Sequence, residues 1–287
     1  MTKSKIKILI IGDVYPVTWK DLYISAAIAA GHEAEFIDVS TIRIDIEREV
    51  TNIFIEEHSI YQFSHIIFLS EVYERLYFYI CYLLKDSGIK ILNSKSILKY
   101  PLLSDKFLQA LINSKNHITM PKSSYTLNPS LIDSKYDYPM VVKTLGASHS
   151  SHSGRGVIKV YTKKHLEYTY ATNIEGALKA QEFIPRDPVF DFRTIMLNGK
   201  SLGTIKRIPQ DGEFRTNGAK ERIIVPDNPK HIMVLKQLSK DIDCEFFAPD
   251  YMIRDEEMII FEINRFPSFS VTESKMPIKI IYYMAKL

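Results

Sequence analysis

The feature that most constrains the fold is an alternation of apolar and helix-like segments over the first hundred residues. Apolar, strand-like runs stand at residues 5–14, 33–40, 65–70 and 89–93, and segments with helical patterning lie between them at 20–32, 44–57 and 71–88. Such alternation predicts βαβ units, hence a parallel sheet with helices on both faces. The first run is followed by "IGDVYP" rather than GxGxxG, which argues against a dinucleotide-binding fold.

From about Ser94 the pattern changes to α+β with antiparallel sheets. Asn198-Gly199 interrupts the apolar stretch 191–208, which is a strong signal for a β-hairpin. A second hairpin is predicted within 248–269, where two apolar runs flank the charged turn Asp255-Glu256-Glu257. Further strands are expected at 138–145, 157–162 and 177–184, and further helices at 104–115, 163–172, 229–242 and 273–287.

The composition argues for an ordinary globular protein. The 287 residues are 46% hydrophobic and 25% charged, and the net charge of +3 is spread along the chain. A nucleic-acid-binding protein usually shows a concentrated basic stripe, so nucleic acid is not an expected partner. The two cysteines have neither metal-ligand nor disulfide spacing, and no apolar run is long enough to cross a membrane. We therefore expect a cytoplasmic protein that does not associate with membranes.

Two acids stand inside strand-like segments of the second hairpin. Pairing the strands about their turn places Asp250 opposite Glu262, and period-two alternation places Glu262 and Asn264 on one face, with Phe261 and Ile263 on the core face. Directly opposed like charges are destabilising. A divalent cation would remove the repulsion, because carboxylate and amide oxygens are hard ligands. A solvated outer face is the alternative.

A polar loop rich in small residues joins the predicted strands at 138–145 and 157–162. Its backbone N–H groups could cradle phosphate oxygens, and Lys143 could add a positive charge; a flexible hairpin loop is the alternative. His149 and His152 in this loop are more typical of exposed residues than of metal ligands. Cationic and polar side chains recur further along, and together they suit a phosphate or carboxylate ligand, at Asp191, Arg193, Lys206, Arg207, Arg215, Asn217, Lys220 and Arg222.

Taken in order, these segments resemble the ATP-grasp superfamily of carboxylate–amine ligases. The RimK-like branch, with ribosomal-protein glutamate ligase and the LysX amino-group-carrier ligases, is the most similar. The quoted matches are "SDKFLQALI", "PMVVKTLGASHSSHSGRGV", "QEFI", "DFRTIMLNGK", "GEFRTN" and "PDYMI…IIFEINRFPSF". The resemblance implies an N-terminal α/β domain, a central ATP-grasp subdomain and a C-terminal one, at 1–93, 94–180 and 181–287.

The resemblance also implies roles for individual residues. Nucleotide contacts fall on Lys106, Lys143, Ser153, Gly154, Gly156, Gln181, Glu182, Phe183, Ile184, Asp191 and Lys206. Arg193, Arg215 and Asn217 would neutralise the transferred phosphoryl group and the tetrahedral intermediate. Asp250, Glu262 and Asn264 would hold Mg²⁺ or Mn²⁺. Thr216 replaces the serine that is usual in the family's Arg-Ser-Asn loop.

The implied reaction is ATP-dependent amide or peptide bond formation through an acyl phosphate. The implied partners are a small-molecule or peptide carboxylate and an amine, with a carrier protein or peptide as a further option. A kinase acting on a hydroxyl and a nucleotide-binding regulator are the alternatives. A homo-oligomer is expected, since members of this branch are commonly dimers or tetramers. The sequence departs from the family's pattern in its longer Ser/His-rich loop, in "RFPSF" after Asn264, and in lacking the substrate-side arginine motif.

Overall fold

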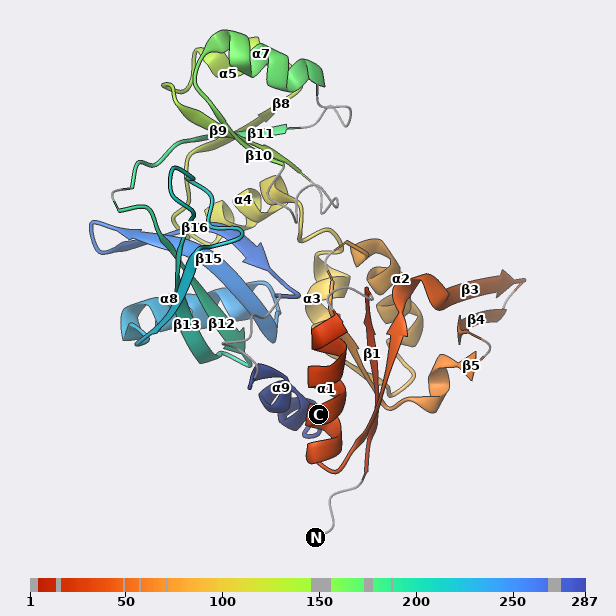
Figure 1. Ribbon diagram of the computed structural model, residues 1–287. Coiled ribbons are helices and arrows are strands. Elements are labelled where there is room, and N and C mark those ends of the chain that lie inside the picture. Colours follow the sequence, from red (N-terminus) through yellow and green to blue (C-terminus); the bar gives the residue numbers. More distant parts are fainter. Residues whose placement is uncertain are drawn as a thin grey trace. The chain divides into compact units, whose positions relative to one another are not determined.

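A computed structural model describes the chain over residues 5–13, 17–48, 50–56, 58–70, 72–145, 156–172, 178–186, 188–267 and 275–287 (Figure 1). The chain divides into two compact units. Unit 1 comprises Met1–Pro101, Ile242–Phe246 and Phe266–Leu287, and unit 2 comprises Leu102–Asp241 and Phe247–Arg265. The division into 1–93, 94–180 and 181–287 stays a prediction.

Unit 1 is built on a parallel sheet, as the alternating pattern predicts. Its strand order is β2-β1-β6-β7, and every neighbouring pair is parallel. Residues 8–11 of β1 are fully buried, because helices cover both faces of a parallel sheet. The strands are β1 (Lys7–Gly12), β2 (Glu33–Asp38), β6 (His65–Phe68) and β7 (Lys90–Ile91), and the helices are α1 (Val17–Ala29), α2 (Glu74–Leu84), α3 (Ser94–Lys99) and α9 (Met276–Met284), with 3-10 turns η1 (Val39–Thr41) and η2 (Ile60–Gln62).

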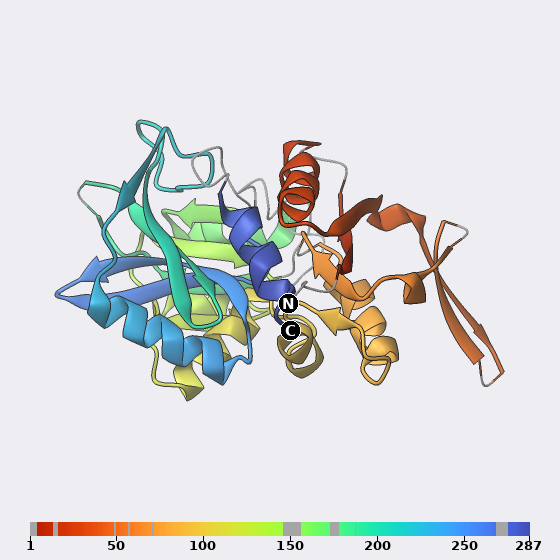
Figure 2. The ribbon, with the colours of Figure 1, turned by 90° about the horizontal axis from the view of Figure 1, so that it is seen from below.

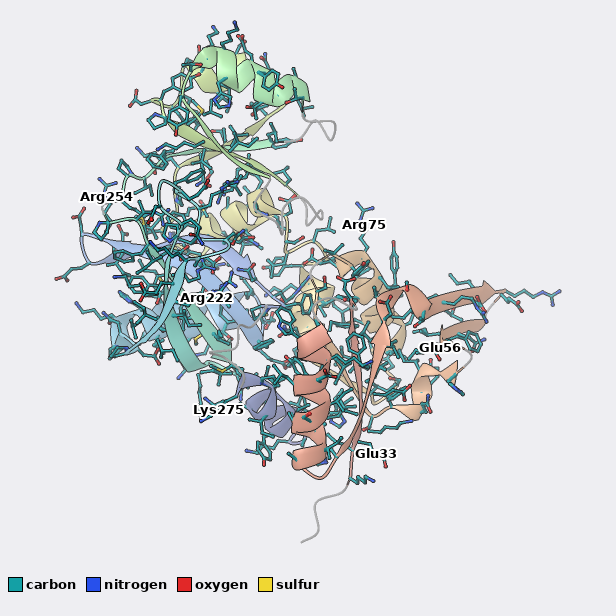
Figure 3. All side chains as sticks on the ribbon, in the orientation of Figure 1. Glu33, Glu56, Arg75, Arg222, Arg254 and Lys275 are labelled. Carbon is teal, nitrogen blue, oxygen red and sulfur yellow. The ribbon has the colours of Figure 1, made fainter. Side chains whose placement is uncertain are left out.

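The helix predicted at 44–57 is wrong. The segment forms the antiparallel strands β3 (Ile42–Glu47) and β4 (Val50–Ile55), and β5 (His58–Ser59) pairs with β4. Isoleucines alternate along both strands, and Ile53 and Ile55 are buried in the core of unit 1, so the apolar period is two rather than 3.6. Figures 1 and 2 show this small sheet extending away from β1, and Figure 3 labels Glu56 at its second turn, where φ is +52°.

Unit 2 contains two antiparallel sheets. The four-stranded sheet has the order β10-β9-β11-β8, and the five-stranded sheet has the order β14-β13-β12-β15-β16. The predicted Asn198-Gly199 turn joins β12 and β13, with positive φ at both residues. The elements are α4 (Lys106–Lys115), β8 (Ser123–Thr126), α5 (Ser130–Asp133), β9 (Met140–Thr144), β10 (Val157–Val160), α7 (Lys163–Thr172), β11 (Leu178–Glu182), β12 (Asp191–Leu197), β13 (Lys200–Ile208), β14 (Glu221–Val225), α8 (Pro229–Asp241), β15 (Phe246–Arg254) and β16 (Glu257–Asn264).

A buried glutamine joins α4 to β16. The Gln109 side chain donates to the carbonyl of Ile263 (2.8 Å) and accepts from its N–H (2.9 Å). Asp105 caps the helix by accepting from the N–H groups of Phe107 and Leu108, each at 2.8 Å. The first turn of α4 is thereby held beside β16. Among the described residues, no helix is long and apolar enough to cross a membrane.

Candidate active site

One cavity of unit 2 gathers most of the residues that the sequence singles out. It lies where β9, β10 and β11 of one sheet meet β12, β15 and β16 of the other. Ten of the predicted residues line it: Lys143, Gln181, Glu182, Phe183, Ile184, Asp191, Arg215, Asn217, Asp250 and Glu262. Val141, Val157, Arg186, Phe214, Thr216 and Phe261 complete the lining. We refer to it as the central cavity.

Asp250 and Glu262 are cross-strand partners, as pairing about the turn predicts. A β-bulge between Asp250 and Tyr251 leaves Phe261 without a partner on the opposite strand. Bulges re-aim side chains, and Phe261 lines the central cavity beside Glu262 instead of joining the core face predicted for it. At the other end of β15, exposed Arg254 points outward (Figure 3). The bulge thus directs two acids and an aromatic ring to one place.

A buried network of arginines and carboxylates surrounds Asp250. Arg193 donates two hydrogen bonds to the Asp250 carboxylate (2.7 and 2.8 Å), and Arg207 adds a third at 2.9 Å. Burial alone would raise the pKa of Asp250, but the two guanidinium groups lower it to about 2. Arg193, which was predicted to face the transferred phosphoryl group, does not line the cavity. Its guanidinium is already hydrogen-bonded to the Asp250 carboxylate.

The same network extends to Asp191. Arg207 donates to both oxygens of Asp191 (2.8 and 2.7 Å), and the Thr216 hydroxyl donates to one of them. Burial raises the pKa of Asp191 although Arg207 opposes the shift. Arg207, which is 2% exposed, therefore ties β12 and β15 together through two carboxylates. Among the sequence signals, only its basic character could have indicated this role.

Three buried lysines converge near Glu262. Lys106, Lys143 and Lys179 are 5%, 6% and 2% exposed. Lys106 lies 3.6 Å from the Glu262 carboxylate, whose pKa the lysine lowers against the effect of burial. Lys143 and Lys179 form no ion pair with any described residue. Burial lowers the pKa of Lys143 to about 8 and that of Lys179 to about 7. Lys179 was not among the predicted site residues.

Apolar side chains line the end of the cavity away from Asp250 and Glu262. Ile184 packs with Phe261 and with Met252, and Phe183 lies edge-on to Phe214. Gln181 is 4% exposed, and its side-chain oxygen accepts no hydrogen bond from the described residues. The Glu182 carboxylate already accepts from the backbone N–H of Lys122 at 2.8 Å. This end offers apolar surface and an unused buried acceptor, which suits an aromatic ring that carries an amino group.

Arg186 is a lining residue that the sequence analysis missed. Its guanidinium donates to the carbonyl of Phe190 (3.0 Å) and to that of Phe214 (2.7 Å). It also stacks over Phe261, with 5.4 Å to the ring centroid. Arg186 thus connects the segment after β11 to the loop that carries Arg215 and Asn217.

Oxygen donors at the acidic end fit a hard divalent cation. Asp250 Oδ2 accepts two hydrogen bonds and Oδ1 only one, so Oδ1 keeps acceptor capacity. The Glu262 side chain is 27% exposed, and Asn264 donates through its amide nitrogen to Ala248 (3.2 Å), which leaves its amide oxygen as a donor atom for a metal. No cluster of three acidic, histidine or cysteine side chains occurs within the described ranges. The Asn264 amide oxygen is therefore needed as a third metal ligand beside Asp250 and Glu262.

The remaining predicted residues are not among the described residues that line the central cavity. Lys106 and Asn264 adjoin the acidic end without lining the cavity, and Lys206 on β13 stacks over Phe190 at 4.0 Å. Gly156 is buried just before β10. Ser153 and Gly154, together with His149 and His152, lie outside the described residues.

Comparisons with known proteins agree on one family. Residues 103–287 match the RimK-like ATP-grasp domain. A relative named "Probable alpha-L-glutamate ligase" from Shewanella pealeana is 24% identical over 277 residues, covering 91% of this chain and 59% of the relative. The chain thus spans about three fifths of that relative's length.

Solved structures show the same fold. A RimK domain ATP-grasp protein from Sphaerobacter thermophilus superposes with a TM-score of 0.70 at 17% identity, covering 98% of each chain. The macrocyclase MdnC from Microcystis aeruginosa, solved with its precursor peptide MdnA, superposes with a TM-score of 0.71 at 17% identity, covering 98% of this chain and all of the other. The predicted ATP-grasp fold, with its parallel and antiparallel sheets, is confirmed.

Proposed function

Because the chain belongs to the RimK-like ATP-grasp family, we propose that it is an ATP-dependent ligase that joins a carboxylate to an amine. One observation carries the proposal: a single cavity combines an apolar end that has an unused acceptor with a polar end that is lined by the buried Lys143 and by paired carboxylates. That is the arrangement a purine nucleotide with a metal-bound phosphate chain requires.

The nucleotide base is proposed to occupy the apolar end. Ile184 and Phe261 would pack against its faces, and Gln181 would accept a hydrogen bond from its amino group. The Glu182 side chain already bonds Lys122, so the backbone around Phe183 is the better source of further contacts to the base. Leaving the Gln181 oxygen unpaired costs about 1–3 kcal/mol, which the base would recover.

The phosphate chain is proposed to lie over Lys143, toward Lys106. Asp250, Glu262 and Asn264 would hold Mg²⁺, which when bound neutralises phosphate charge. Arg193 and Arg207 would hold the Asp250 carboxylate in its ionised form and orientation. Arg215 and Asn217, on the loop that Arg186 holds, are the lining groups proposed to face the transferred phosphoryl group.

The proposed reaction proceeds in two steps. A substrate carboxylate oxygen attacks the terminal phosphorus of ATP, the bond to the bridging oxygen breaks, and ADP leaves with that electron pair. The amine then attacks the acyl phosphate carbon, phosphate departs, and the amine gives up a proton. Positioning and charge neutralisation would provide most of the rate in the first step.

For the substrates, we propose an amino acid and a peptide. The name of the Shewanella relative suggests glutamate as the amino acid, and the precursor peptide bound to MdnC suggests a peptide as its partner. Several cations line the cavity or adjoin it, which suits an anionic acid such as glutamate.

The test incubates the full chain with Mg-ATP, single amino acids and pools of short peptides, and measures ADP and product mass. ADP that forms only with an acid and an amine present, with a product mass equal to their sum less water, would support the ligase. A product that gains a phosphoryl group would indicate a kinase instead. Nucleotide binding without ADP in any pool would favour a regulator. Glu262→Gln serves as the inactive control.

A further inference from the structure

Lys179 lies in a buried position, where a charged side chain is costly for folding. It stands in the middle of β11 with 2% of its surface exposed, a setting in which apolar residues are usual. Its ammonium donates to the carbonyl of Lys106, the first residue of α4, at 3.2 Å. Within the described ranges, this one hydrogen bond leaves two of its three N–H groups without an acceptor.

The surroundings of Lys179 are positively charged. Lys143 is its direct partner on β9, and opposed residues on antiparallel strands have Cβ atoms about 5 Å apart, where like charges repel. The first turn of α4 adds the positive end of a helix dipole. The charged or titratable groups that face it from the packed elements are Lys143 of β9, Tyr125 of β8, Lys106 and Asp105 at α4, and Glu262 of β16.

Glu262 cannot balance this charge. Among the carboxylates that raise the pKa of Lys179, Glu262 has the larger effect and Asp105 the smaller, and the Glu262 carboxylate already faces Lys106 at 3.6 Å. If all three lysines were protonated, they would outnumber the carboxylates of Glu262 and Asp105 by one charge in a site with little solvent. Buried charges require paired partners, so the described residues leave an excess of positive charge that a bound anion would balance.

We propose that Lys179 is a third lysine of the nucleotide site, which takes up a proton when the phosphate chain binds in the central cavity. The inference rests on the proposed function, since it needs a polyphosphate in that cavity. Lys179 does not line the cavity, so it acts as a positioning residue: it is paired with Lys143 across strands β11 and β9, and its hydrogen bond holds the start of α4 and thereby Lys106.

The protonation equilibrium supports the same conclusion. Burial lowers the pKa of Lys179 to about 7, with the charge of Lys143 as the next cause. Without nucleotide, Lys179 therefore gives up its proton more readily than an exposed lysine does. A bound polyphosphate favours the charged form and raises the pKa, so binding draws protons from the buffer.

Isothermal titration calorimetry with Mg-ADP measures this proton uptake directly. The full chain is titrated at pH 7 in buffers of different ionisation enthalpy, such as PIPES and Tris, and the slope of observed enthalpy against ionisation enthalpy counts the protons. We expect the wild-type protein to take up more protons on binding than Lys179→Met does, by up to about one proton per molecule. The difference should shrink toward zero at pH 5.5, where Lys179 is already charged. Lys164→Met, an exposed lysine of α7, should behave as the wild type.

A second variant keeps the test valid if the methionine protein folds poorly. Lys179→Arg carries its charge at every pH, so it should bind Mg-ADP without this proton uptake. Equal proton uptake by wild type, Lys179→Met and Lys179→Arg would overturn the inference while leaving the ligase proposal intact. A wild-type protein that binds no Mg-ADP would overturn both. Lys143 also titrates, with a pKa of about 8, and its pKa responds to the charge at position 179, so the neutral Lys179→Met and the charged Lys179→Arg bracket its contribution.

Discussion

Replacing Arg207 by methionine should destabilise unit 2 more than any surface substitution. Arg207 donates three hydrogen bonds, at 2.8, 2.7 and 2.9 Å, to two carboxylates that are 4% and 6% exposed. Charge-assisted hydrogen bonds contribute about 1.5–3 kcal/mol each, but their sum overstates the effect, because the variant no longer has to desolvate a guanidinium group. Removing one partner of a buried ion pair typically costs about 3–5 kcal/mol, and we expect a loss in that range.

The assay is urea unfolding at pH 7 followed by far-UV circular dichroism. Amide hydrogen exchange then locates the change, and peptides from β12 and β13 should lose protection. The matched control is Arg254→Met, because Arg254 forms only an exposed pair with Asp255 at 3.7 Å and should change the unfolding free energy by less than about 1 kcal/mol.

Two further measurements test the reasoning. Burial already raises the pKa of Asp191 in the folded state, and loss of Arg207 should raise it further. A folded-state pKa above the unfolded value means that folding takes up a proton, so the deficit of Arg207→Met should shrink as the pH falls through the folded-state pKa of Asp191. Adding Asp191→Asn should recover about 1–3 kcal/mol. A loss no larger than that of Arg254→Met, or no recovery in the double variant, would refute the argument.

Three other predictions concern the central cavity and the residues around it. Glu262→Gln should keep the fold and lower turnover by about 100-fold or more, with weaker Mg²⁺ dependence; unchanged kcat would contradict the metal assignment. Arg186→Met should lower kcat/KM for ATP by about 10- to 100-fold, with partial recovery in Arg186→Lys. Equal activity of all three proteins would show that the loop carrying Arg215 and Asn217 keeps its position without Arg186. Lys179→Met should raise the unfolding free energy by about 1–4 kcal/mol at pH 7. Because the folded-state pKa of Lys179 is lowered from 10.5 to about 7, that gain should fade as the pH rises from 7 toward 10.5, and a gain independent of pH would count against it.

Local patterns were enough to predict the β15–β16 hairpin and its opposed acids. Alternation and a charged turn fix the register of two adjacent strands, so Asp250 pairs with Glu262 as predicted. The bulge beside Asp250 was not predictable in the same way. One extra residue changes which face Phe261 occupies, and no residue type in this stretch marks the bulge.

The segment 44–57 shows how a short apolar pattern misleads. Acidic and basic residues among its isoleucines give a spacing that also suits a helix. The alternation of Ile42, Ile44 and Ile46 favours a strand, and β-branched residues lose side-chain freedom in helices. Tertiary packing decided the outcome, because Ile53 and Ile55 complete the core of unit 1.

The missed site residues share one property: their roles depend on partners far away in sequence. Arg186 acts through the carbonyl of Phe214, which is 28 residues later, and Lys179 bonds the carbonyl of Lys106, which is 73 residues earlier. Each reads in sequence as an ordinary surface charge. Only the fold shows that Lys179 is buried and directly opposite Lys143.

The two groups of buried charge in unit 2 have opposite consequences. Around Asp250, the two arginines balance the two aspartates, so that network is complete without a ligand and serves to hold the acid in place. Around Glu262, three lysines outnumber the carboxylates of Glu262 and Asp105, so we propose that an anion of high charge completes that group. The group around Asp250 fixes the position of its carboxylate. The group around Glu262 lowers the unfolding free energy of the protein without ligand, because like charges are buried close together. If the nucleotide binds as proposed, part of the binding energy of the phosphate chain would go into protonating and ordering the lysines, which would limit affinity for the nucleotide but make the active arrangement conditional on it.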